Sequence, residues 1–131
     1  MSEDQFDALW NRACGFDSPA LRSHPGDEAL HVALVFHGSV MNGGLLNAVE
    51  TYGSDEVYSL PRVQQAYSYI GLDEPAQAIK QARRELLELA ESDLENAEGR
   101  IDASYALEDE DLVRAARSTV DRTPEAFAPL I

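Results

Sequence analysis

One glutamate and one histidine stand at the spacing that proteins use to bind a metal from a single helix. Glu28 and His31 form an E-x-x-H pattern, which places a carboxylate and an imidazole on the same helix face. Di-metal helical bundles need this pattern twice, and here it occurs once. We therefore interpret His31 as a helix residue with satisfied hydrogen bonds, and the sequence predicts no metal or cofactor. His37, on a predicted buried helix, is expected to form hydrogen bonds in the core.

The sequence also lacks the motifs that predict nucleophilic or nucleotide chemistry. It contains no G-x-S-x-G, P-loop or dinucleotide-binding glycine pattern. Cys14 is the only cysteine, so it cannot form an intramolecular disulfide, and we interpret it as a small buried apolar residue. The sequence therefore predicts a protein without catalytic residues, which is not an enzyme.

Acidic residues are more prominent candidates for a function. The chain of 131 residues carries 24 acidic and 10 basic residues, for a formal net charge of −14, and Lys80 is its only lysine. Residues 85–111 alone hold eleven acidic residues and one basic residue. Such a surface repels nucleic acid and anionic membranes and attracts basic partners.

Five of these acids would lie on one helix face if the helix predicted to begin at Asp73 continued past residue 90. The intervals between them are three, four, three and four residues, which keeps side chains on one side of a helix. The five are Glu88, Glu91, Glu95, Glu98 and Asp102. At about 5 Å apart along the axis, their carboxylates would imitate part of one phosphate strand of DNA. A candidate second patch consists of Glu108, Asp109, Glu110 and Asp111.

A simpler interpretation of the same acids stays open. A charged face opposite an apolar face is what any solvated helix displays, and Gly99 is a candidate terminator of this helix. In that case the acidity serves only solubility. The chain would then be a structural or accessory helical domain, such as an immunity-like partner of a toxin.

The elements that must position these residues are all predicted to be helical. Helical periodicity or a start signal is found at Ser2, Asp27, Leu45, Ser59, Asp73 and Asp109, and Thr123 begins a short last turn. No segment shows the sustained alternation of a strand. We expect a single all-α domain over residues 1–131, with six or seven helices around a buried central helix.

Several helix ends have recognisable signals. Ser2 and Gln5 form a capping-box pattern, and Asp73 is a predicted N-cap. Gly71, followed by the apolar Leu72, is typical of a Schellman motif at the end of a helix.

Asn42, Gly43 and Gly44 interrupt the apolar sequence between two predicted helices. Asn and Gly adopt left-handed backbone conformations readily, so Asn42 and Gly43 are expected to end one helix before Leu45 begins the next. Without a Cβ at Gly44, the two backbones can approach closely. We interpret this tripeptide as a structural corner.

The same segment carries a resemblance to a known family. Motifs similar to those of the bacterial DNA-mimic protein family occur at Asn42-Gly43-Gly44, Leu45, Gly53, Ala66 to Gly71 and Thr123 to Phe127. The resemblance covers roughly residues 28–128. It implies an all-helical domain, often dimeric, that binds a DNA-binding protein through an acidic surface and has no catalytic residues.

The acidic surface and the resemblance together predict a protein-interaction domain. It would occupy the DNA-binding surface of a basic transcriptional regulator or nucleoid protein, with no direct contact to nucleic acid or membrane. The start, MSEDQFDALW, is acidic where a secretory signal is basic, and the apolar runs are shorter than a membrane span, so we expect a cytoplasmic protein.

Overall fold

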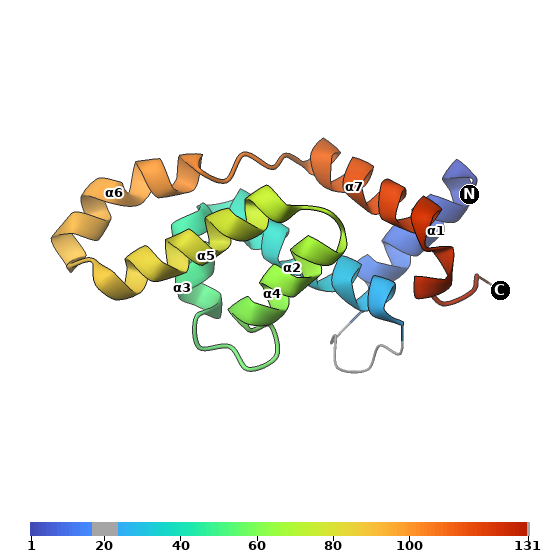
Figure 1. The fold of residues 1–131 in the computed structure, drawn as a ribbon, viewed down its shortest axis with the longest axis horizontal. Coiled ribbons are helices and arrows are strands. Elements are labelled where there is room, and N and C mark those ends of the chain that lie inside the picture. Colours follow the sequence, from blue (N-terminus) through green and yellow to red (C-terminus); the bar gives the residue numbers. More distant parts are fainter. Residues whose placement is uncertain (17–23, 131) are drawn as a thin grey trace.

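The structure is a computed structural model that describes residues 1–16 and 24–130. These residues form seven α-helices and one short 3₁₀ helix without a strand, which confirms the predicted all-α class. The helices are α1 (Glu3–Cys14), α2 (Pro25–Gly43), α3 (Leu45–Tyr52), α4 (Leu60–Tyr69), α5 (Asp73–Glu88), α6 (Glu91–Ala103), α7 (Asp109–Arg122) and the 3₁₀ helix η2 (Pro124–Ala126). In Figure 1 the turn between α5 and α6 forms one end of the elongated molecule, and α1 and the C-terminus lie at the other end.

The central element is α2, as its apolar sequence predicts. Leu30, Val32 and Ala33 are fully buried, and α2 contacts α1, α3, α4, α7 and η2. The helix begins at Pro25, two residues before the predicted start, because proline fits the first turn, where its missing N–H is not needed.

The apolar side chains form two clusters on different sides of α2. The larger cluster unites α2, α3, α4 and α5, and the smaller one packs α1, α7 and η2 around Leu30. Trp10 and Leu34 are partly buried and pack against both clusters. These two side chains therefore stand where α1 and α7 meet the main body of the protein.

Two predicted helix ends have the expected geometry. Ser2 and Gln5 exchange both capping-box hydrogen bonds, at 3.2 and 3.0 Å. At the end of α4, Gly71 has a φ of 81°, and the N–H of Leu72 donates to the carbonyl of Tyr67 as in a Schellman motif.

Two predicted helix starts have different outcomes. The N-cap of α5 is Leu72, so the prediction of Asp73 is wrong by one residue. Asp73 lies in the first turn, where its negative charge still interacts favourably with the helix dipole. The short last turn is present as η2, and Phe127 behind it is buried.

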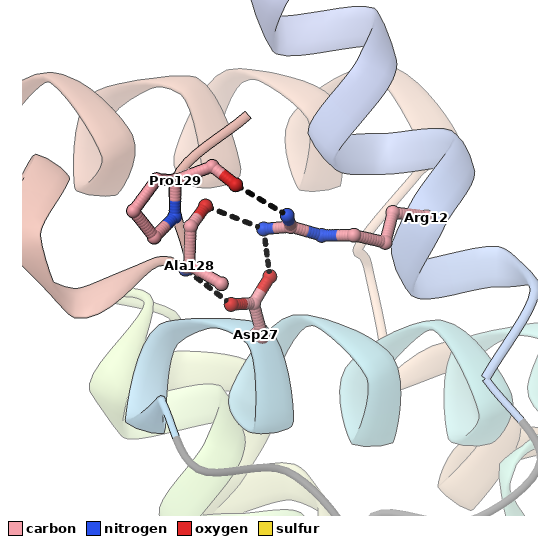
Figure 2. A network of polar contacts seen from close by, with 4 residues as sticks. All are labelled: Arg12, Asp27, Ala128 and Pro129. Atoms are coloured by element: carbon pink, nitrogen blue, oxygen red, sulfur yellow. Dashed lines mark hydrogen bonds and ion pairs between the residues drawn. The ribbon is translucent and has the colours of Figure 1, made fainter. Parts of the chain in front are cut away.

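A buried polar network fastens the C-terminal segment to the first two helices (Figure 2). Arg12 Nη2 donates to Asp27 Oδ1 at 2.7 Å and to the carbonyl of Ala128 at 3.0 Å, and Nη1 lies 3.5 Å from the carbonyl of Pro129. The backbone N–H of Ala128 donates to the other oxygen of Asp27 at 2.7 Å. Asp27 is only 3% exposed, so its charge depends on these donors for solvation.

Replacing Asp27 by asparagine tests this network. The variant removes the charge that Arg12 and the Ala128 N–H share, and we expect the free energy of unfolding to fall by roughly 1.5–3 kcal/mol, the range for hydrogen bonds to charged groups. Urea unfolding followed by circular dichroism measures the change. Asp7→Asn, on the exposed face of α1, is the control that loses the same charge. Equal stability of the two variants would contradict the role of Asp27.

Candidate partner-binding surface

The long acidic helix expected from the sequence is two helices. α5 ends at Glu88, Leu89 and Ala90 are extended with ψ angles of 144° and 156°, and α6 begins at Glu91. The condition for five acids on one continuous helix face is therefore not met, because Glu88 lies before this turn. Gly99, the suspected terminator, lies inside α6.

The turn allows α6 to pack its apolar residues on the body of the protein. Ile101 is buried, and Leu94 and Ala97 are partly buried against the main cluster. Arg100 and Glu85 join α6 to α5 through an ion pair with an N–O distance of 2.6 Å. Tertiary packing thus outweighs the helical propensity of residues 86–90.

Three of the exposed carboxylates in the first turns of α6 share one side of the helix. Glu91, Glu95 and Glu98 are exposed, and none has a hydrogen-bond or ion-pair partner in residues 1–16 and 24–130. Their steps of four and three residues place them on one side of the helix over about 10 Å. We call these three residues the α6 acidic face.

Asp102 follows the same spacing but has a different environment. It is half-buried, and its Oδ1 accepts a 2.9 Å hydrogen bond from the backbone N–H of Leu46 in the first turn of α3. The carboxylate thereby caps α3 from another helix and lies at the positive end of the α3 dipole. Asp102 therefore positions α6 on α3 through one of its oxygens.

The Asn-Gly-Gly corner provides the space for this carboxylate. Asn42 and Gly43 complete α2, and the positive φ, 89°, belongs to Gly44, so the prediction of left-handed Asn42 and Gly43 is wrong. A Cβ on Gly44 would lie 2.5 Å from an oxygen of Asp102. The close approach that needs glycine is therefore to a carboxylate of α6 and not to a second backbone.

The second acidic patch mainly stabilises the start of α7. Glu108 is the N-cap, and it exchanges both capping-box hydrogen bonds with Asp111. Asp109 Oδ1 lies 2.7 Å from His37 Nε2. Only Glu110 of this patch is exposed without a partner in the described part of the chain.

His37 connects this patch to a chain of buried phenols. Its Nδ1 lies 2.8 Å from the hydroxyl of Tyr105, which lies 2.7 Å from the hydroxyl of Tyr67. Burial raises the pKa of both phenols, so both keep their protons. His37 therefore forms hydrogen bonds in the core, as the sequence predicts.

The E-x-x-H pair is not arranged for a metal. His31 Nδ1 lies 2.9 Å from the carbonyl of Ala13 and Nε2 lies 2.8 Å from the hydroxyl of Tyr58, so both ring nitrogens are engaged. Glu28 approaches Arg62 at 3.9 Å. Within residues 1–16 and 24–130, no three potential ligands gather around one point.

Cys14 differs from its predicted setting. The thiol belongs to an exposed residue at the end of α1 and not to the core. Partial burial raises the pKa of this thiol, which keeps it protonated and reduces its reactivity as a nucleophile.

These features define an all-α protein in which α6 contacts the Asn-Gly-Gly corner through Asp102 and carries an acidic face without partners in the described residues. The family model of DMP19-like proteins, a DNA-mimic family, matches residues 23–126, and the chain belongs to this family. No curated protein and no solved structure gave a significant match. None of the helices in the described residues is long and apolar enough to cross a membrane.

Replacing Asp102 by alanine tests its role as the anchor of α6. The variant leaves the α3 N–H of Leu46 without its acceptor, and we expect a loss of roughly 0.5–2 kcal/mol, the range for a lost helix cap. Amide hydrogen exchange should accelerate in both α3 and α6. Glu98→Ala removes an exposed carboxylate from the same helix, and it should leave exchange in α3 unchanged. Equal exchange rates in the two variants would refute this role.

Proposed function

We propose that this chain is a non-enzymatic, cytoplasmic protein that occupies the DNA-binding surface of a basic transcriptional regulator or nucleoid protein. The observation that carries the proposal is the α6 acidic face, whose three carboxylates have no partner in the described residues. Glu88 and Glu110 add exposed charges before and after it. Membership of a DNA-mimic family supports the same conclusion.

The geometry suits an extended basic surface. α6, the segment of residues 104–108 and α7 follow one another along one long side of the molecule (Figure 1). A partner that lies along this side would meet the α6 acidic face first and the start of α7 next. Because duplex DNA has one charge per roughly 3.4 Å of each strand, α6 imitates only part of one strand, and a second copy of the chain would extend the imitation.

The acids at the end of α5, in α6 and at the start of α7 have two different proposed roles. Glu88, Glu91, Glu95, Glu98 and Glu110 are the carboxylates that would pair with arginine and lysine of the partner. Asp102, Glu108 and Asp111 fix α6 and the start of α7, and Asp109 is held by His37 through one oxygen while its second oxygen has no partner in the described residues. Because the paired charges lie on helices that are already formed, binding costs little conformational entropy.

Other features support a role without catalysis. His31 and His37 each have both ring nitrogens in hydrogen bonds within the protein. The raised pKa of Cys14 disfavours the thiolate.

A charge-reversal variant tests the proposal. Replacing Glu91, Glu95 and Glu98 by lysine should abolish capture of a basic DNA-binding protein from the host lysate, because attraction becomes repulsion. The wild-type protein should capture this partner at low salt and release it at high salt or when duplex DNA is added. Mass spectrometry identifies the captured protein.

The matched control carries the same change of charge elsewhere. Asp4, Glu56 and Glu125 are exposed acids outside α6 and the start of α7, and their triple replacement by lysine should leave capture nearly intact. An equal loss of capture in both triple variants would mean that the change in net charge alone causes the loss. A partner that resists salt and DNA would favour an accessory domain whose acidity serves solubility, and would overturn the proposal.

A further inference from the structure

A pocket of about 360 Å³ opens where α1, α2 and α7 meet, beside the acidic start of α7. Its volume lies within the range of about 300–1,000 Å³ that is typical of small-ligand sites. Trp10, Leu34, Met41 and Leu112 supply an apolar lining, and His37 and Asp109 supply the polar groups. Met41 is 51% exposed, which places it at the rim.

The polar groups of the pocket are arranged for a cation. His37, whose side chain is 6% exposed, holds Asp109 Oδ1 at 2.7 Å, and the Asp109 side chain itself is 82% exposed. One carboxylate oxygen is thus fixed by the protein, while the second has no hydrogen-bond partner in the described residues. Glu108, Glu110 and Asp111 add negative charge around it.

The neighbouring turn of α1 already binds a guanidinium in this way. Arg117 lies over the ring of Phe6, with Cζ 4.6 Å from the ring centroid, and its Nη2 approaches Glu3 at 3.7 Å. Trp10 is one turn further along α1, with its ring 6.0 Å from that of Phe6. Beside Trp10 the carboxylate of Asp109 is present, but no arginine or lysine of the described residues lines the pocket.

We propose that this pocket receives one arginine side chain of the basic partner. The methylene groups would pack on Leu34 and Met41, and the guanidinium would face the Trp10 ring and donate to Asp109. Arginine fits better than lysine because its planar, weakly hydrated cation stacks on aromatic rings, and tryptophan is the strongest aromatic acceptor of a cation. This inference rests on the proposed function and adds a specific anchor to its general charge attraction.

The test uses the fact that Trp10 is the only tryptophan of the chain. N-acetyl-arginine amide is titrated at constant ionic strength, and the fluorescence and the indole N–H resonance of Trp10 are followed. We expect a saturable change. The citrulline counterpart has the same shape without the charge, and it should bind at least about tenfold more weakly because it loses a charge-assisted hydrogen bond.

Two variants locate the binding in the pocket. Asp109→Asn should weaken the arginine response by about tenfold, whereas Glu56→Gln, which loses one exposed negative charge outside the pocket, should not. Because Asp109 also contacts His37, Met41→Lys provides a second variant at an exposed rim position, where the new cation should repel the probe. An absent response, an equal response to citrulline, or equal responses in the Asp109 and Glu56 variants would overturn the inference.

Capture of the partner separates this inference from the proposed function. If Asp109→Asn still captures a partner that DNA displaces, and the arginine probe does not bind, the acidic mimicry stands and the pocket inference fails. If the probe binds in the pocket but no such partner is captured, the pocket is a guanidinium site and the proposed function fails.

Discussion

The hydrogen bond between Asp102 and the start of α3 determines where the acidic helix lies. α6 has one fully buried side chain, Ile101, so apolar contacts alone hold it weakly. Asp102 and Arg100 add polar contacts to α3 and α5 in its last turn. The first turns, which carry the α6 acidic face, are held only by the partly buried Leu94 and Ala97 and by the helix itself. Gly44 contributes to this position, because a Cβ there would lie 2.5 Å from an oxygen of Asp102.

The protein uses most of its few cations internally, and this leaves the surface acidic. Arg12 fastens the C-terminal segment, and Arg83 donates to the carbonyl of Gly53 at 3.0 Å. Intramolecular ion pairs or hydrogen bonds are made by Arg12, Arg62, Arg83, Arg100, Arg114, Arg117 and Arg122. Repulsion among the remaining carboxylates disfavours the compact state. Acids placed at helix starts recover part of this cost, because the positive ends of the dipoles stabilise them.

Much of the fold could be predicted from local sequence signals. The features that depend on contacts between distant residues could not. The capping box at Ser2, the end at Gly71 and the apolar periodicity of α2 depend on residues within a few positions of each other. No glycine or proline marks the break at Leu89 in the sequence. The break follows from the packing of α6 on the main cluster. The hydrogen bond from Leu46 to Asp102 joins positions 56 residues apart. The regular spacing of the acids therefore grouped Asp102 with the exposed carboxylates, and its structural contact could not be predicted.

The charge on Asp109 also orders the protons of three buried groups. A carboxylate only accepts hydrogen bonds, so in the tautomer with its hydrogen on Nε2 His37 donates to Asp109 and accepts at Nδ1 from Tyr105. Tyr105 must then accept from Tyr67, and this hydrogen bond lowers the pKa of Tyr105 in opposition to its burial. The chain runs from α4 through α2 to the start of α7 without an unsatisfied donor. Because His37 already holds the exposed carboxylate of Asp109 in place, binding a cation there costs little side-chain entropy.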